Sequence, residues 1–361
     1  MIALADVIER FAPDYHARYG HTLSRERTQA LGAMQHCRNR MAPHLLASCP
    51  ECDEHRLIPH SCGHRLCPHC QHHECERWLE RQRRLQVPAE YFLLTFTLPG
   101  ELRPLAVRHA RGVYAALFSA AWATVQTFCC NDRQLKGEAG AIAVLHTHSR
   151  RLDLHPHVHL VMPGASLDAR SRRWRTKTGF LFSHKALAKV FRARLLAALK
   201  HEGLSLPSRL PQRWVVDCKR VGNGDKALVY LGRYLYRGVI READILSSDN
   251  GQVSFRYRDS QSSQMKVRTL PGADFLHLLL QHVLPKGFRR ARNYGFLHPN
   301  KRGLITLLHW VLRIAPHPPP DTPRPPLLCP CCGTPMRILR RRIAPALVRR
   351  RIPVPAVETA V

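Results

Sequence analysis

The sequence predicts an α+β fold, in which an antiparallel sheet is flanked by helices and follows a small cysteine-rich domain. Strand-like and helix-like patterns follow one another from residue 88 to 315 without the strict βαβ rhythm of a parallel sheet. Seven of the 13 cysteines fall between Cys37 and Cys75, ahead of that region. The 361 residues, 45% of them hydrophobic, suffice for two or three domains and at least one sizeable core.

The elements of the central region follow from hydrophobic periodicity. Runs of β-prone residues predict strands at residues 91–98, 141–145, 154–162 and 252–258. Apolar residues at helical spacing predict helices at residues 104–128, 184–201, 225–237 and 273–284. Pro99-Gly100 stops the first strand, and Gly238 is a suitable stop for the third helix.

Composition divides the chain into three predicted regions. Residues 1–85 form a Cys-, His- and Arg-rich N-terminal domain, and residues 88–315 form the central domain. Residues 316–361 are a basic tail that holds 12 of the 27 prolines and the arginine runs 340–342 and 349–351. This composition is typical of an extended or flexible segment, so we expect the tail not to pack.

The charge of the chain indicates a polyanionic partner. Lysine plus arginine is 56 against 26 acidic residues, which gives a formal net charge of +30. Nucleic acid is the default partner, because phosphate contacts release counterions. No stretch approaches the ~20 apolar residues of a membrane span, and Asp6 stands where a signal peptide would be apolar. We therefore expect a cytoplasmic protein without a membrane partner.

The clustered cysteines predict structural zinc. Cys49-x-x-Cys52 is followed after 14 residues by Cys67-x-x-Cys70, and two such knuckles complete a tetrahedral four-thiolate site. A site filled by four thiolates has no open position, so this zinc is expected to be structural. Four residues nearby either hold a second zinc or are ordinary surface and core residues: Cys37, His44, His60 and Cys62. The tail offers Cys329-Pro-Cys331-Cys332, a knuckle with no visible partner pair.

Three histidines alternate along the predicted strand at 154–162. His155, His157 and His159 share one face, and neighbours on that face are roughly 6.5–7 Å apart, so an adjacent pair can chelate one ion. If residues 149–154 are the loop of a hairpin, His146 lies opposite His157 and can supply a third ligand. Imidazoles around an ion with open positions suit a Lewis acid acting on a phosphoryl oxygen. The alternative is a histidine-rich sheet face without metal.

Two tyrosines lie on adjacent turns of the predicted helix at 225–237. Tyr230 and Tyr234 face away from the leucine stripe and share an arc of roughly 100° with three cations. These cations are Lys226, Arg233 and Arg237. Positive charge favours the phenolate and binds phosphate, which makes the tyrosines candidate nucleophiles and the cations candidate phosphate ligands. The alternative is that both tyrosines are packing residues; Tyr236 projects from another face.

These motifs resemble those of a known superfamily. His157-Val-His159 resembles the HUH signature of rolling-circle nucleases, and Tyr230-Leu-Gly-Arg-Tyr234 resembles the paired-tyrosine motif of its two-tyrosine insertion-sequence transposases. The resemblance extends to Phe96-Thr-Leu-Pro99, Leu284-Pro-Lys-Gly-Phe288, Tyr294-Gly-Phe296 and the zinc-binding region, and covers most of residues 30–300. It implies an antiparallel sheet with the histidine strand at its centre and the tyrosine helix facing it.

The resemblance also implies an activity. Mg or Mn on His157 and His159 would polarise a phosphate of single-stranded DNA, and Tyr230 or Tyr234 would attack it to give a 5′-phosphotyrosine link. Such a transposase would rejoin strands without a nucleotide cofactor. One alternative with the same chemistry is a replication initiator or a relaxase. The other is a zinc-dependent DNA-binding regulator without catalysis, which would leave the histidines and tyrosines unexplained.

Overall fold

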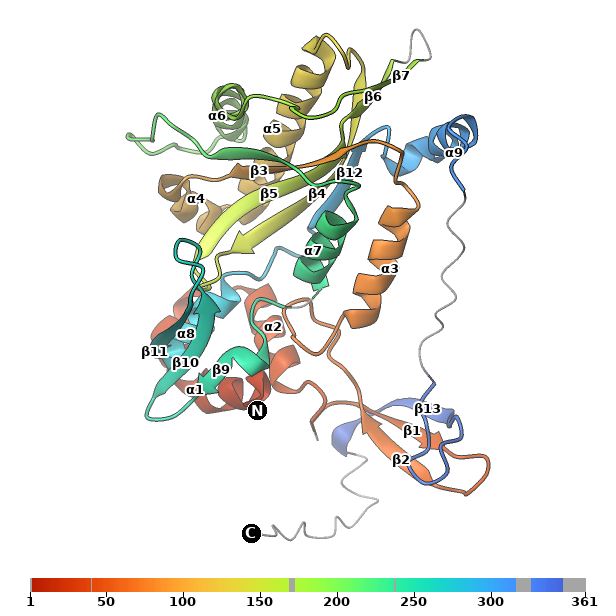
Figure 1. The fold of residues 1–361 in the computed structure, drawn as a ribbon. Helices are drawn as coiled ribbons and strands as arrows, with labels where there is room; N and C mark the ends of the chain where they lie inside the picture. Colours follow the sequence, from red (N-terminus) through yellow and green to blue (C-terminus); the bar gives the residue numbers. More distant parts are fainter. Residues whose placement is uncertain (1, 40, 169–172, 237, 316–325, 347–361) are drawn as a thin grey trace.

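The centre of the fold is a seven-stranded sheet in which every pair of strands is antiparallel (Figure 1). A computed structural model describes residues 2–39, 41–168, 173–236, 238–315 and 326–346. The sheet has the order β7-β6-β4-β5-β3-β8. β12 pairs with residues 140–144 of β4, next to residues 138–139, which pair with β6. Its strands are β3 (Tyr91–Thr97), β4 (Glu138–His148), β5 (Leu154–Pro163), β6 (Ala165–Asp168), β7 (Arg173–Thr176), β8 (Val216–Arg220) and β12 (Ala291–Gly295). The predicted α+β class is confirmed.

One face of the sheet packs against three helices. They are α4 (Arg103–Arg108), α5 (Ala110–Asn131) and α6 (His184–His201). Alternate residues of β3 and β5, such as Phe96, Val158 and Leu160, point into this core and are fully buried. Among the described helices, α5 is long and apolar enough to cross a membrane, by length and composition only. The sequence analysis did not expect any segment to come this close to a membrane span. Here it packs against α6, β4 and β5.

The opposite face of the sheet carries the tyrosine helix α7 (Asp225–Tyr236). Its predicted leucine stripe is buried against Val144 and Val161 of the sheet. Helix α3 (His72–Arg83) packs against α7, and a Cβ on Gly232 would lie 3.3 Å from Trp78, so glycine permits this close approach. Helix α9 (Arg302–Val311) belongs to the same core through Ile305.

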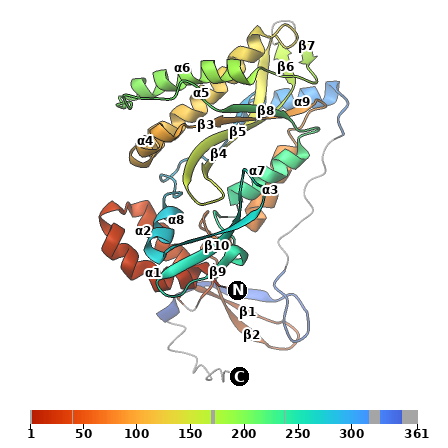
Figure 2. The same cartoon turned by 60° about the vertical axis from the view of Figure 1, so that its left-hand side comes forward.

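A second body joins the N-terminal helices to a β-ribbon from late in the chain (Figure 2). Its elements are α1 (Leu4–Tyr19), α2 (Arg25–Gln35), β9 (Ile245–Ser247), β10 (Gln252–Arg258), β11 (Met265–Pro271) and α8 (Gly272–Leu280). Phe11 of α1 packs on Gly272, where any Cβ would clash with its ring. The core of this body therefore crosses the predicted boundary between residues 85 and 88.

A third, small sheet brings the two ends of the chain together. β1 (His44–Ser48) pairs with β2 (His55–Pro59) on one side and with β13 (Arg337–Ile343) on the other. The expectation that the tail does not pack is therefore wrong for residues 326–346, because β13 completes this sheet and Cys329 and Met336 are buried in its core. The remaining tail residues, 316–325 and 347–361, lie outside the described residues.

Several elements differ from their predicted bounds. The predicted helix at 104–128 is divided near His109 into α4 and α5, and the helix at 273–284 ends at Leu280. β4 is longer than the predicted 141–145 and includes His146. Strands β1, β2, β6 to β9 and β11 to β13 were not predicted, and four short helices connect longer elements. These are η1 (Gly20–Thr22), η2 (Gly100–Leu102), η3 (Glu242–Asp244) and η4 (Pro299–Lys301).

Candidate metal and tyrosine site

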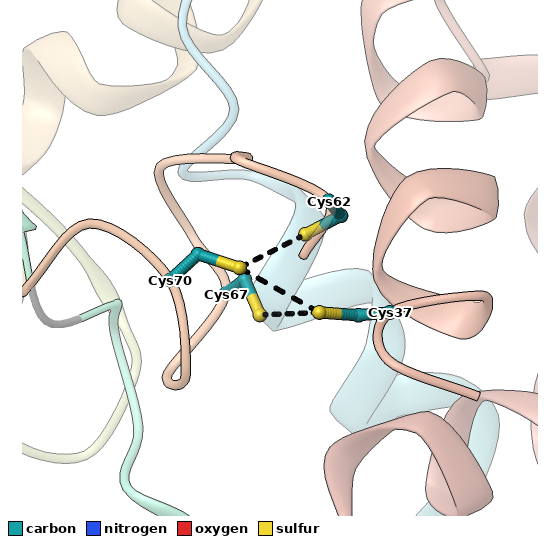
Figure 3. A group of neighbouring side chains, drawn as sticks. All are labelled: Cys37, Cys62, Cys67 and Cys70. Carbon is teal, nitrogen blue, oxygen red and sulfur yellow. Dashed lines mark hydrogen bonds between the residues drawn. The ribbon is translucent and has the colours of Figure 1, made fainter. Parts of the chain in front are cut away.

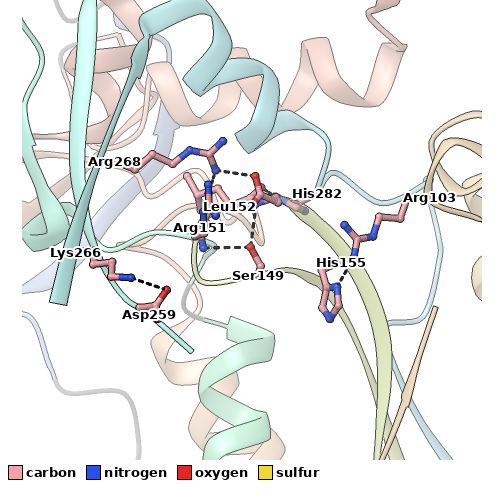
Figure 4. Close-up of polar contacts among 10 residues, drawn as sticks. Arg103, Ser149, Arg151, Leu152, His155, Asp259, Lys266, Arg268 and His282 are labelled. Carbon is pink, nitrogen blue, oxygen red and sulfur yellow. Dashed lines mark hydrogen bonds and ion pairs between the residues drawn. The ribbon is translucent and has the colours of Figure 1, made fainter. Parts of the chain in front are cut away.

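The three histidines proposed as metal ligands meet on the face of the sheet that carries α7. β4 and β5 form a hairpin in which His146 pairs directly with His157, the register that the sequence predicted. His159 follows on the same face, because side chains two residues apart on a strand point the same way. One ring nitrogen from each of these histidines lies within 4.8 Å of the others. His155, on the same face, hydrogen-bonds instead to Arg103 (Figure 4).

The environment of these imidazoles fits a metal ion. Nε2 of His146 and Nε2 of His159 are buried and have no hydrogen-bond partner among the described residues, which is costly unless another ligand satisfies them. Nδ1 of His157 donates to the His155 carbonyl at 2.7 Å, which leaves the Nε2 lone pair of His157 free. Burial lowers the pKa of His157 to about 4 and that of His159 to about 3. Both rings are therefore neutral near pH 7, as metal ligation requires.

Thr95 of β3 orients one of these histidines. Its hydroxyl lies 2.8 Å from Nδ1 of His159, with which it pairs across the strands. A hydrogen bond to the other nitrogen of a metal-binding imidazole typically contributes 10- to 100-fold in metal affinity.

We therefore expect Thr95→Val to weaken Mn²⁺ binding about tenfold in a calorimetric titration. Thr97→Val is the matched control, because Thr97 lies on the same face of β3 and makes no hydrogen bond to these histidines among the described residues. Equal affinities of the two variants would show that Thr95 does not orient His159.

Tyr230 is the tyrosine that is open to solvent. Its side chain is 48% exposed, and its ring centroid lies 5.8 Å from that of His146 and 5.9 Å from that of His159. Partial burial raises its pKa, and the nearby Arg150 opposes that shift. The hydroxyl-bearing ring thus borders the histidine cluster on a side that a substrate can reach.

Tyr234 is held in a different environment. Its ring stacks on His146, with centroids 3.2 Å apart. Its hydroxyl accepts hydrogen bonds from the backbone N–H groups of Thr147 (3.0 Å) and His148 (3.2 Å), and it lies 2.8 Å from Nδ1 of His148. Because two donors occupy its lone pairs, the hydroxyl itself donates to that nitrogen. Burial raises the pKa of Tyr234, and Arg290 opposes the shift.

A cation from outside α7 contacts Tyr234. The guanidinium carbon of the buried Arg290 lies 4.8 Å from the centre of the Tyr234 ring. Of the predicted phosphate ligands, Lys226 and Arg233 are exposed on α7, and Arg237 lies outside the described residues. Sequence reasoning missed Arg290, although it lies two residues after the Leu284-Pro-Lys-Gly-Phe288 motif.

The turn of the histidine hairpin is anchored in the second body (Figure 4). Leu152 adopts a left-handed backbone conformation with φ of 67° and is buried in the core of α1, α2 and α8. His282 hydrogen-bonds to the Leu152 carbonyl at 2.9 Å. Arg268 donates to the carbonyl of Arg151 and to Asp153. The N-terminal helices and the β-ribbon therefore hold one end of the strands that carry the metal ligands.

One four-cysteine cluster lies inside the core of the second body (Figure 3). Its members are Cys37, Cys62, Cys67 and Cys70. Sulfur–sulfur distances of 3.5–3.6 Å along its contacts approach the ~3.8 Å edge of a tetrahedron with Zn–S bonds near 2.3 Å. These residues fit a closed zinc site at the end of α2.

A second four-cysteine cluster joins the N-terminal hairpin to the tail. Cys49 and Cys52 lie at the turn of the β1–β2 hairpin, and Cys329 and Cys332 come from the segment before β13. The sulfur–sulfur distances are 3.4–3.7 Å. This cluster also has the geometry of a closed tetrathiolate site.

The predicted grouping of the zinc ligands is therefore wrong. The quartet Cys49, Cys52, Cys67 and Cys70 is divided between two clusters, because the β1–β2 hairpin projects its turn away from α2 (Figure 1). Cys37 and Cys62 of the possible second site complete the first cluster. The other two members of that set, His44 and His60, lie on or beside the small sheet and in neither cluster.

Two family models match the chain. The model described as "Transposase zinc-binding domain" matches residues 7–98, and the model described as "Putative transposase" matches residues 140–303. The first contains six of the eight clustered cysteines, and the second contains the histidine hairpin and α7.

Individual proteins agree with these models. The chain is 32% identical over 318 residues to "Putative transposase y4qJ" of Sinorhizobium fredii, covering 81% of this chain and 80% of the relative. It is 30% identical over 290 residues to the transposase for insertion sequence element IS801 of Pseudomonas savastanoi pv. phaseolicola, covering 75% and 67%.

Among solved structures, a metal-bound complex of the conjugative relaxase TrwC with DNA matches at 19% identity and a TM-score of 0.28, covering 36% of this chain and 49% of that chain. A second TrwC complex, with mutant DNA, matches at 16% identity and a TM-score of 0.27, covering 62% and 74%. The family follows from the sequence relatives. The chain belongs to the insertion-sequence transposases that carry an N-terminal zinc-binding domain.

Proposed function

We propose that this transposase nicks and rejoins single-stranded DNA in rolling-circle transposition, through a 5′-phosphotyrosine link to Tyr230. One observation carries the proposal. The exposed ring of Tyr230 borders three histidines, two of which bury an Nε2 atom without a hydrogen-bond partner among the described residues. A nucleophile beside a metal-ligand set is the arrangement that phosphoryl transfer to a side chain requires.

His146, His157 and His159 would hold the divalent ion. Three neutral imidazoles are expected to bind Mg or Mn more weakly than a set of carboxylates would. We therefore expect oxygens of the bound phosphate to fill the remaining coordination positions of the ion. When bound, the ion supplies Lewis-acid polarisation of the scissile phosphate.

In the cleavage step, Oη of Tyr230 forms a bond to the phosphorus. The P–O bond to the 3′-oxygen of the preceding nucleotide breaks, the phenol proton leaves to solvent, and the released 3′-oxygen takes up a proton. The exposure of Tyr230 allows both the DNA and the proton acceptor to reach its hydroxyl. Rejoining reverses these changes when a 3′-hydroxyl attacks the phosphotyrosine, so no nucleotide cofactor is needed.

Tyr234 is suited to a later step. Its hydroxyl must give up two backbone hydrogen bonds before it can reach a phosphate, and His148 stands ready to accept its proton. Tyr230 makes the first attack because it needs no such rearrangement. Lys226 and Arg233 extend the positive charge of α7 along the DNA.

The proposal is tested by incubating the protein with Mn²⁺ and a single-stranded oligonucleotide that carries an end of its element. We expect a detergent-resistant adduct of protein and DNA on a denaturing gel, and we expect His157→Ala to lack it. Specific binding without an adduct in the wild type would favour a non-catalytic DNA-binding regulator instead. DNA binding that does not weaken as salt is raised would contradict the inference that the basic charge of the chain binds phosphates.

A further inference from the structure

A groove of about 1320 Å³ runs beside the tyrosine helix, on the flank away from β5. It is lined by residues of α3, the end of α7, β12 and α9. The catalytic step proposed above does not use this groove.

The walls of the groove are strongly basic. Seven arginines line it, against a single acidic residue, Glu74. Arg84 forms an ion pair with Glu80, whereas Arg81 and Arg302 are exposed and form no ion pair with any described carboxylate. These last two stand on opposite walls, on α3 and at the start of α9. Such an excess of unpaired positive charge attracts a chain of phosphates.

Arg290 adds a buried charge at the inner end of the groove. It is only 6% exposed, and its Nε donates to the carbonyl of Leu145 at 3.1 Å. No described carboxylate forms an ion pair with it. A buried cation without a counter-charge is costly, and an anion at the groove end would offset that cost.

The groove reaches the catalytic face through Arg290. The Arg290 guanidinium lies against the Tyr234 ring, and the same ring stacks on His146. Arg290, which lines the groove, and His146 of the metal-ligand set therefore contact the same aromatic ring. A strand bound in the groove would enter the site from the β4 side, past Tyr234.

We propose that this groove binds the backbone of the single-stranded DNA that flanks the scissile phosphate, a placement that rests on the proposed nicking activity. The side chains of Tyr236, Tyr294 and His298 line it among the arginines, and rings interleaved with cations are typical of surfaces for single strands. Duplex DNA offers no unstacked bases to such rings.

The experiment compares two double variants, each combined with Tyr230→Phe to prevent cleavage. Arg81→Glu with Arg302→Glu alters the groove, and Arg209→Glu with Arg213→Glu makes the same charge change on an exposed loop elsewhere. Affinity for a fluorescent single-stranded element end is measured by anisotropy at several salt concentrations. We expect the groove variant to bind at least tenfold more weakly, with a salt slope smaller by about 1.4 for two lost phosphate contacts. The loop variant should match the parent.

The outcomes separate the groove from the nicking activity. Equal binding by the groove and loop variants overturns the groove assignment, as does tighter binding of a duplex or an RNA of the same sequence than of the single strand. Adduct formation is measured separately in proteins that retain Tyr230, with a short oligonucleotide that spans only the cleavage position. Its absence in the wild type would overturn the nicking proposal even where the groove variant loses binding.

Discussion

Replacing Tyr230 by phenylalanine is expected to abolish the covalent protein–DNA adduct and to slow strand cleavage about 1,000-fold or more, as loss of a nucleophile does in other enzymes. The substitution removes one oxygen and keeps the ring beside His146 and His159. Metal binding and DNA binding should therefore remain close to the wild type. The measurement is the rate of adduct formation on a labelled single strand in Mn²⁺.

Two further tyrosines of α7 make this test specific. Tyr236→Phe is the control for loss of a tyrosine hydroxyl on α7, because it keeps the ring that lines the arginine groove, and no ring contact joins Tyr236 to the three histidines among the described residues. Tyr234→Phe should still form the adduct on a substrate with a single element end, since its hydroxyl is engaged with His148 before the first attack. An adduct that survives in Tyr230→Phe but disappears in Tyr234→Phe would reverse the proposed order of the two tyrosines.

The histidine cluster could be predicted because its geometry is local. Alternation along one strand places His157 and His159 on one face, and a hairpin of the predicted length brings His146 opposite His157. The leucine stripe of α7 likewise follows from helical periodicity alone. Both signals depend on residues within about twenty positions of one another, which is the range over which strand and helix geometry constrain a sequence.

The different environments of Tyr230 and Tyr234 could not be predicted from α7. A helical wheel places both on one arc, but the sheet beneath them differs. Tyr234 lies over His146 near the end of β4, where Thr147 and His148 offer backbone donors. Arg290 comes from the segment just before β12, more than fifty residues later. The asymmetry arises from tertiary packing, which no local pattern encodes.

The predicted domain boundary between residues 85 and 88 does not match the packing of the chain, for a related reason. Composition marks residues 1–85 as a unit, yet α1 packs on α8 from residues 272–280, and Leu152 of the histidine hairpin is buried in the same core. An apolar helix face shows that it needs a partner but not which segment supplies one. The joint core ties the metal-ligand strands to the cysteine-rich body.

The two cysteine clusters show how far the partner of a motif can lie. Cys49-x-x-Cys52 and Cys67-x-x-Cys70 have the spacing of one zinc site, and short-range reasoning joins them. The structure instead pairs the first knuckle with Cys329 and Cys332, about 280 residues away, and β13 carries that segment back to β1. The tail knuckle was visible in the sequence, but its partner could not be identified.

Removing the tail cysteines is expected to remove one of two bound zinc ions. The protein as purified should contain two zinc ions per chain, one in each cluster, by plasma mass spectrometry. Cys329→Ser with Cys332→Ser should retain one, because the tetrathiolate site that joins the tail to the β1–β2 hairpin loses half of its ligands. Structural zinc contributes on the order of 10 kcal/mol to the fold that it closes, so the segment around β13 should become sensitive to protease.

Cys331 provides the matched control, since it lies between the two tail ligands, is exposed, and belongs to neither cluster. Cys331→Ser should keep both zinc ions and the protease resistance of the tail. Cys67→Ser should instead lose the other ion and unfold the N-terminal body, because that cluster is buried in a core shared with α1 and α8. Retention of two zinc ions in the double tail variant would show that Cys329 and Cys332 are not ligands, and that β13 is held by strand pairing alone.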